Sequence, residues 1–276
     1  MSFPLIKYIK TEKNLLPEEM RLSVCIKANG FSFSVIDRSF RLQALGEFEV
    51  DLSRGITSVM SNIKACFASI DIRNFKFEKI KVINLTDKQV WIPYKLYDTK
   101  QNKTYIKVLC DVLSSETILA STLESIDAVS VYAIPLSHYS GIKVAMPAAK
   151  YCSAQEILVH HAFEISSFST NTFLLHKRRE TFDMIVFKGN NFVFSNSFVC
   201  ANATDMIYYI LFALSRLDID VEEINFVITG DSYSEKEFAM LRRHVKHVSF
   251  ANPLENTKAG FEFDETDLQP YFLVLQ

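Results

Sequence analysis

The chain has 276 residues, of which 49% are hydrophobic and 22% charged, so it has enough apolar content for a substantial buried core. Its formal net charge of −2, with both signs mixed along the chain, provides no field that would favour nucleic acid or an anionic membrane. Neither a secretory signal pattern nor an apolar run near the roughly 20 residues of a membrane helix is found, so we expect a cytoplasmic globular protein without membrane insertion.

The first part of the chain predicts a hairpin, a third strand, a helix and a fourth strand. Apolar residues alternate on both sides of an Asn-Gly turn within 22–35, which is a strong hairpin signal. A strand at 44–50 follows, and Ser53 is placed to cap a helix whose apolar residues recur at helical spacing from 56 to 67. The mostly apolar stretch 80–85 predicts a strand in a sheet covered on both faces.

The middle of the chain predicts a strand at 127–134, which Pro135 ends, and then a short amphipathic stretch from Ser137. A strand at 150–153 and a helix at 154–165 follow. The polar segment 166–171 is the best boundary in the chain. We therefore predict two domains, 1–165 with an insertion and 166–276.

The second part of the chain repeats this order of elements. Alternating apolar residues flank a Gly-Asn turn, and 188–194 is similar to 27–33. A strand at 197–201, a helix at 206–217 capped by Thr204 or Asp205, and a strand at 224–229 complete the match, and a helix at 234–245 and a strand at 248–251 follow. We interpret this as an internal duplication, the alternative being two lobes that share strand chemistry by chance. The predicted fold class is α/β, with two ribonuclease-H-like lobes, each a mixed β-sheet flanked by helices.

Four blocks in sequence resemble an uncharacterised bacterial family of unknown function that has the actin-like ATPase fold, and more distantly the pilus-assembly protein PilM. The blocks are RLSVCIKANGFSF at 21–33, VWIPYKLYD at 90–98, DAVSVYAIP at 127–135 and INFVITGD at 224–231. The resemblance implies two lobes that face each other across a cleft. Nucleotide-binding members of the superfamily have an Asp-x-Gly-Thr-like turn in each lobe and a Gly-Gly loop near the adenosine.

The resemblance also implies where a nucleotide would bind in this chain. The matching turns are 27–30 (Lys-Ala-Asn-Gly) and 188–191 (Lys-Gly-Asn-Asn), and the loop is 229–232 (Thr-Gly-Asp-Ser). Neither turn has a carboxylate that could hold Mg²⁺, the loop has one Gly in place of two, and no P-loop or GxGxxG pattern occurs. We expect a degenerate site without a cofactor, with ATP and Mg²⁺ as the alternative, and assign no catalytic or metal-binding residue. The candidate cofactor-binding residues are Lys27, Asn29, Gly30, Lys188, Gly189, Asn190, Gly230 and Asp231.

Other chemistry-bearing residues favour structural roles. His160 and His161 are neighbours on one predicted helix and cannot both face one metal ion, so we expect one of them in the core or against the other lobe. The basic cluster 177–179 is interpreted as a solvated lobe edge, with a phosphate or RNA contact as the alternative. The five cysteines are widely spaced without a CxxC pair, which is typical of reduced thiols.

Aromatic residues at 91–97 are the best surface candidate for a partner. By resemblance to PilM-like proteins, whose first lobe has a groove for a partner peptide, Trp91, Tyr94 and Tyr97 are candidates to border such a surface, whereas a loop that packs on its own lobe is the interpretation we favour. Two functions remain open. One is a non-catalytic interaction or scaffold protein, and the other is a diverged ATPase or small-molecule kinase that uses the interlobe cleft.

Overall fold

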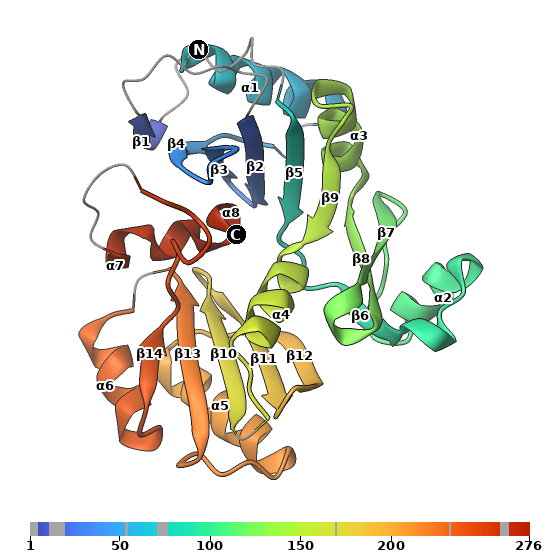
Figure 1. Ribbon diagram of the computed structural model, residues 1–276. Helices are drawn as coiled ribbons and strands as arrows, with labels where there is room; N and C mark the ends of the chain where they lie inside the picture. The colour runs from blue at the N-terminus through green and yellow to red at the C-terminus, as the bar shows by residue number, and fades with distance from the viewer. Residues whose placement is uncertain are drawn as a thin grey trace.

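The structure is a computed structural model, which describes residues 5–10, 20–52, 55–70, 77–168, 170–231, 233–259 and 265–276. Figure 1 shows two sheets, one above the other, with helices between them and further helices on their outer faces. No helix within these residues is long and apolar enough to cross a membrane.

The first sheet has the strand order β1-β4-β3-β2-β5-β9. Its strands β2, β3 and β4 are antiparallel, β5 and β9 run parallel to β2, and β1 extends the sheet beyond β4. Helices α1 and α3 cover its outer face and share one apolar core with it. The bounds are β1 Leu5–Lys10, β2 Met20–Lys27, β3 Gly30–Asp37, β4 Leu42–Glu49, α1 Gly55–Ser69, β5 Lys79–Asn84, α3 Leu136–Ala145 and β9 Lys150–Ser153.

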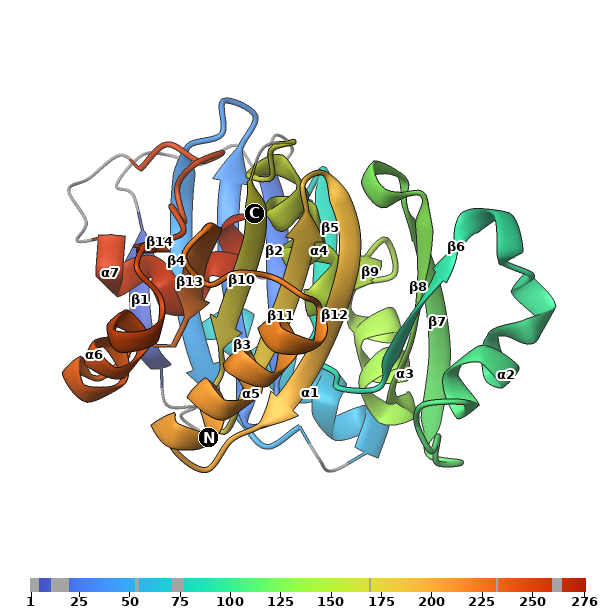
Figure 2. The same ribbon diagram turned by 90° about the horizontal axis from the view of Figure 1, so that it is seen from below.

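The second sheet has the strand order β12-β11-β10-β13-β14. Again three strands are antiparallel and two run parallel to the first of them, so the two sheets have the same topology once β1 is set aside. This repetition is what the predicted duplication requires, and it confirms the predicted fold class. Helix α5 crosses the outer face of this sheet in Figure 2. The bounds are β10 Asn171–Lys177, β11 Thr181–Lys188, β12 Asn191–Val199, α5 Ala203–Arg216, β13 Ile224–Gly230, α6 Glu235–His244 and β14 Val248–Phe250.

The repeated order of strands in the second unit begins at β10, one strand before the hairpin from which the repeat was predicted, because no strand was predicted at 171–177. The hairpin at 188–194 is β11–β12, the second hairpin of its unit, and so it is not the counterpart of 27–33. The counterpart is the β10–β11 turn at 178–180. Strand β10 shows no alternation because its apolar run 173–175 is buried on both faces of a central strand. The strand predicted at 197–201 is the end of β12.

Side chains cap several helices at their first turn. The cap of α5 is Asn202, whose side chain accepts hydrogen bonds from the backbone N–H groups of Thr204 and Asp205, the two residues predicted as caps. Helices α4 (Ala154–Glu164) and α6 each begin with a capping box, from Ser153 and Ser234 respectively. The predicted cap Ser53 lies outside the described residues.

The insertion in the first unit forms a small sheet of its own between β5 and α3. Its strand order is β6-β8-β7, and in Figure 1 it projects to the right of the first sheet together with α2. The strand predicted at 127–134 is β8, whereas β6 and β7 were not predicted. The bounds are β6 Gln89–Pro93, α2 Asn102–Lys107, β7 Glu116–Leu123 and β8 Ala128–Pro135, with single 3₁₀ turns at Tyr94–Leu96, Thr99–Gln101 and Glu124–Ile126.

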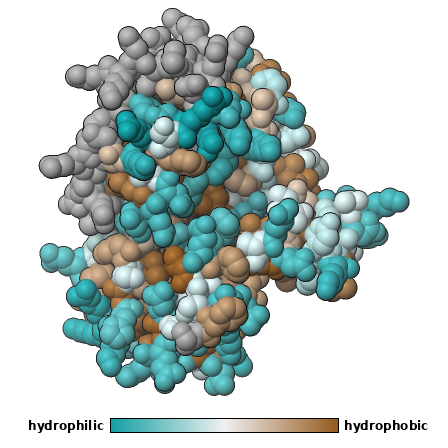
Figure 3. Space-filling view, viewed as in Figure 1, coloured by the Kyte–Doolittle hydropathy of each residue, from teal (hydrophilic) through white to brown (hydrophobic). Residues whose placement is uncertain are grey.

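A central apolar layer joins the two units. It contains α4, α8 (Phe272–Leu275) and inward-facing residues of both sheets, such as Leu45 and Leu174. Figure 3 shows brown apolar residues between the upper and lower halves of the molecule. The short helix α7 (Glu265–Leu268) and the 3₁₀ turn Gln269–Tyr271 precede α8, whose Val274 carbonyl accepts a hydrogen bond from Ser34 of β3. The predicted boundary at 165/166 falls between α4 and β10 and stays a prediction.

Candidate functional site

A cavity of about 900 Å³ lies between the two units. The ends of β2, β5, β10 and β13 open into it, and Leu273 and Val274 of α8 form part of its wall. Ligands of open α/β sheets bind outside the carboxyl ends of parallel strands. This cavity, which we call the cleft, is therefore the candidate functional site.

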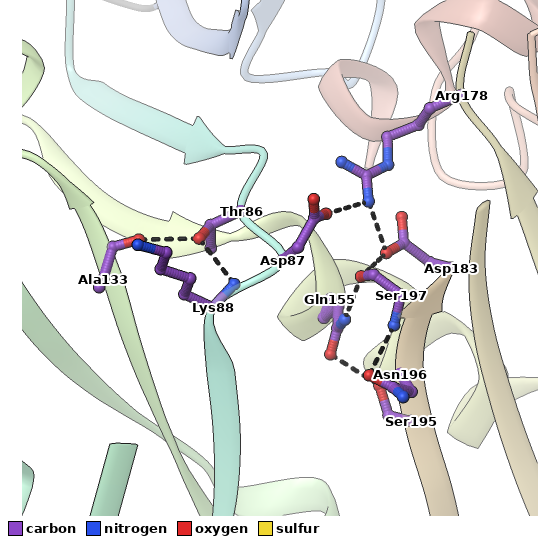
Figure 4. A network of polar contacts seen from close by, with 10 residues as sticks. All are labelled: Thr86, Asp87, Lys88, Ala133, Gln155, Arg178, Asp183, Ser195, Asn196 and Ser197. Carbon is purple, nitrogen blue, oxygen red and sulfur yellow. Dashed lines mark hydrogen bonds and ion pairs between the residues drawn. The ribbon is translucent and has the colours of Figure 1, made fainter. Parts of the chain in front are cut away.

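Arg178 of the β10–β11 turn connects the two units inside the cleft. Its guanidinium donates to Asp87, which follows β5, at 2.7 Å, and to Asp183 of β11 at 3.1 Å. The same Asp183 oxygen accepts a hydrogen bond from Ser197, which is in turn bonded to Gln155 of α4 (Figure 4). The guanidinium is thus held in a network that runs from the insertion through the second sheet to α4.

The lysines around the cleft also form ion pairs with neighbouring carboxylates. Each pair is short, and both partners are at least half-buried. A bound phosphate would therefore compete with a carboxylate for each of these ammonium groups. The pairs are Lys27 with Glu47 at 2.7 Å, Lys88 with Glu116 at 2.8 Å and Lys177 with Glu237 at 2.7 Å.

A row of buried polar residues crosses the inner face of the second sheet beside Arg178. His176 lies opposite Asp183 in the β10–β11 register and next to Thr229 of β13. Burial lowers the pKa of His176 to about 3, with Arg178 and Lys27 adding to the effect, so its imidazole is neutral. Burial raises the pKa of the Asp183 carboxyl, and the charge of Arg178 opposes this shift.

Cys25 is at the corresponding position of the first sheet, opposite Ser32. Burial raises the pKa of its thiol to about 12, so it is not a thiolate nucleophile at neutral pH. The cleft therefore offers a buried proton acceptor, His176, without an activated cysteine beside it.

Two carboxylates of the second unit that lie near the turns of the cleft have environments that affect how they could bind a magnesium ion. Mg²⁺ binds through carboxylates and phosphates, but Asp183 is held by Arg178 and Ser197, and burial raises the pKa of Asp231. Within the described residues no group of three His, Cys, Asp or Glu side chains is arranged to hold a metal ion. Gly30, at the start of β3, has a structural reason: a Cβ there would lie 2.0 Å from the carbonyl oxygen of Phe48 in the neighbouring strand β4.

The structure brings together only part of the predicted site. Lys27, Asn29, Gly230 and Asp231 line the cleft, and Gly30 begins β3 beside them. Asp231 is next to β10 because its N–H donates to the carbonyl oxygen of Lys177 at 2.8 Å.

Lys188, Gly189 and Asn190 are at the opposite end of the second sheet, because β11 runs antiparallel to β10. Gly189 there approaches the backbone of Phe168. Their assignment to the cleft is corrected by the register: the turn that reaches it contains 178–180. The basic cluster directly after the apolar run 173–175 was the sequence signal for this turn.

The aromatic residues of the predicted partner surface have three different environments. The Trp91 ring packs edge-on against Phe192 of β12, with ring centroids 5.5 Å apart. Tyr97 packs against Tyr105, and Tyr94 is 54% exposed. Four aliphatic residues of the insertion are exposed as well, and we call the five residues together the α2 surface: Tyr94, Leu96, Val108, Leu109 and Leu113.

Two units of this topology, facing each other across a cleft, define a protein with the actin-like ATPase fold. The chain belongs to a family of proteins of unknown function, DUF3822, whose model matches residues 11–248. This match confirms the resemblance to a family of unknown function that the four sequence blocks indicated. No curated protein matches the chain.

Solved structures show the same fold. A Bacteroides thetaiotaomicron VPI-5482 protein with an actin-like ATPase fold and unknown function is 22% identical at a TM-score of 0.77, with 94% of this chain and 96% of that one covered. A PilM–PilN type IV pilus biogenesis complex gives 13% identity, a TM-score of 0.57 and coverage of 92% and 96%. The ethanolamine utilization protein EutJ from Carboxydothermus hydrogenoformans is 9% identical at a TM-score of 0.53, with 95% of this chain and 91% of that one covered.

Proposed function

We propose that this protein is a non-catalytic interaction protein, in which an actin-like scaffold holds a protein partner and the cleft does not use a nucleotide. The observation that supports this most directly is the pairing of Arg178 with Asp87 and Asp183. The arginine stands at the turn that would face a phosphate, and its charge is already neutralised by two carboxylates.

A nucleotide would have to break this arrangement in order to bind. If a phosphate took Arg178 from Asp183, it would leave a buried carboxylate without its cation. Breaking a buried pair in this way costs about 3–5 kcal/mol, which corresponds to about two to four powers of ten in affinity. If Arg178 stayed in place, the phosphate would instead meet the negative charge of Asp87.

Titration calorimetry with Mg-ATP tests this proposal. We expect no binding with a Kd below about 100 µM, and no increase in thermal stability at millimolar Mg-ATP. A variant with Asp183→Asn and Asp87→Asn, which frees Arg178, is the matched comparison. Tight binding to the unmodified chain would overturn the proposal, whereas binding to the double variant alone would support it.

The α2 surface supports the protein-partner part of the proposal. Its five apolar side chains are exposed on a subdomain that projects from the body of the molecule (Figure 1), and we propose that they form one apolar patch of the kind that marks an interaction site. A structural neighbour is also a protein in a complex, PilM with PilN. We therefore place the partner at Tyr94 and its exposed neighbours, and the packing of Trp91 and Tyr97 supports a structural role for these two residues.

Quantitative co-purification from the native host tests this surface. A variant with Leu96→Asp and Leu109→Asp should lose the partner proteins that the unmodified chain retains. Val144→Asp is the control, because Val144 is also exposed but lies on α3. If both variants retain the same partners at unchanged amounts, the α2 surface is not the docking site.

A diverged nucleotide-dependent enzyme is the second candidate, because the cleft has the volume of a small-molecule site and contains the neutral base His176. The Mg-ATP titration decides between the two functions. We also propose a cytoplasmic location, which the five free cysteines support.

A further inference from the structure

A second cavity, of about 420 Å³, lies between α4 and the strands β5 and β9. Figure 1 shows α4 directly below these strands, with the end of the chain beside them. Leu123 of the insertion, Asn256 and Gln276 complete its wall. The cavity thus touches the first sheet, the insertion and the second unit at once, and it shares no lining residue with the cleft.

One face of α4 forms a wall of this cavity. Ile157, His160, His161 and Glu164 follow one another at helical spacing and all line it. The His161 side chain is only 3% exposed, and neither of its ring nitrogens has a hydrogen-bond partner among the described residues. The closest carboxylate oxygen, of Glu255, is 3.7 Å from Nδ1, which is beyond hydrogen-bond distance.

The protonation of His161 follows from this burial. Burial lowers the pKa of its imidazole, so at neutral pH the ring has one N–H donor and one acceptor nitrogen. A buried polar group without a partner costs free energy. Both ring nitrogens are themselves buried, so a ligand atom satisfies one of them only after the ring turns toward the cavity.

Two lysines belong to the opposite wall of the cavity. Lys81 of β5 and Lys150 of β9 are direct register partners on neighbouring parallel strands, and both line the cavity. Lys81 donates to the backbone oxygen of Gln276 at 2.9 Å. Within the described residues Lys150 has no ion pair. Like charges on neighbouring strands, about 5 Å apart, repel each other, and an anion between them removes the repulsion.

The acidic residues of the cavity do not supply that anion. Glu156 is buried, and its carboxylate accepts a hydrogen bond from the N–H of Ser153 at 2.9 Å in the capping box of α4. Glu164 lies 3.5 Å from His160 on its own helix. Among the described residues, neither Glu156 nor Glu164 forms an ion pair with Lys81 or Lys150.

We propose that this cavity binds a small amphipathic anion, a carboxylate or a phosphate ester with an apolar body. The anionic group lies between Lys81 and Lys150, and the apolar part packs against Leu123 and Ile157. The imidazole of His161 turns toward the cavity and forms a hydrogen bond with a polar atom of the ligand. The volume is within the usual range of small-molecule sites.

Four probes test the proposal in calorimetric titration: octanoate, phenyl phosphate, octanol and inorganic phosphate. Octanoate or phenyl phosphate should bind at least about tenfold more tightly than octanol and than inorganic phosphate, since a charge-assisted hydrogen bond and apolar burial each contribute on that scale. Which of the two anions binds identifies the head group. Equal binding of octanol, or of inorganic phosphate, would overturn the proposal, and so would the absence of binding by both amphipathic anions.

Two variants and a spectroscopic readout locate the binding. Lys150→Met should weaken binding about tenfold or more, whereas Lys103→Met, on α2, should leave it unchanged. The imidazole proton signals of His161, assigned by their loss in His161→Gln, should shift on titration with the anion that binds. Unchanged affinity in Lys150→Met, or unchanged His161 signals, would show that the anion binds elsewhere.

Discussion

Replacing Arg178 by Met should destabilise the protein far more than replacing Asp87 by Asn, although both substitutions break the same ion pair. The Arg178 side chain is 16% exposed, and its two partners differ: Asp87 is 55% exposed and Asp183 only 2%. Loss of the exposed pair costs about 1 kcal/mol or less. Loss of the arginine leaves Asp183 buried as an uncompensated charge, which costs about 3–5 kcal/mol.

Urea denaturation followed by circular dichroism measures both free energies of unfolding, and pH supplies an independent test. The guanidinium is the largest influence that opposes burial at Asp183, so without it the pKa of Asp183 in the folded variant rises further above the value in the unfolded chain. The folded state then binds the proton more tightly, and stability is lost as pH rises through the folded pKa. The deficit of Arg178→Met against the unmodified protein should therefore be larger at about pH 7.5 than at about pH 5.

The double variant Arg178→Met, Asp183→Asn is the control, because it leaves no charge buried. It should recover much of the stability that Arg178→Met loses. Equal costs for Arg178→Met and Asp87→Asn would refute the reasoning. A deficit that does not depend on pH would do the same.

Three further substitutions have expected outcomes. The pKa of His176 is lowered from 6.5 to about 3, so its contribution to stability is complete above pH 6.5 and is lost as pH falls toward 3. In this range His176→Asn should reduce the dependence of the free energy of unfolding on pH by about 1.4 kcal/mol per pH unit, which acid unfolding curves measure. Gly230→Ala should destabilise more than Gly55→Ala in thermal unfolding, since both have positive φ but only at Gly230 would a Cβ meet a backbone oxygen, at 2.1 Å; equal costs would count against this. Phe192→Ala should shift the fluorescence of Trp91, the single tryptophan, to longer wavelength, and an unchanged spectrum would mean that the ring contact is not made in solution.

Local patterns were sufficient for most elements of the fold. The β2–β3 hairpin follows from apolar alternation around an Asn-Gly turn, and α4 follows from one apolar face behind Ser153. Strand β10 was missed because it lies between β11 and β13 and is buried on both faces, so that its alternation disappears. Without that strand, the match between the two units started at the wrong hairpin. The second phosphate-binding turn was therefore predicted at 188–191 instead of 178–180.

The candidate site depends on pairs that are distant in the sequence. Lys27 and Asp231 were predicted from their turns, and the structure places both in the cleft. The pairing of Arg178 with Asp87 has no local signal, because these residues come from different units and meet only after both sheets have formed. A basic cluster that looks solvated in the sequence is therefore a link between the units in the structure.

The amino-acid sequence by itself determined the two-unit α/β fold and the absence of a carboxylate at the first turn, 27–30, because periodicity and turn residues are local properties. Only the tertiary structure decided which turn of the second unit faces the cleft and what its cations bind. It also decided that Lys81, Lys150 and His161 surround one cavity. These features depend on strand register and on the packing of the two units. The net free energy of such polar contacts is set by how deeply they are buried, and the pattern of residues along the chain does not specify that burial.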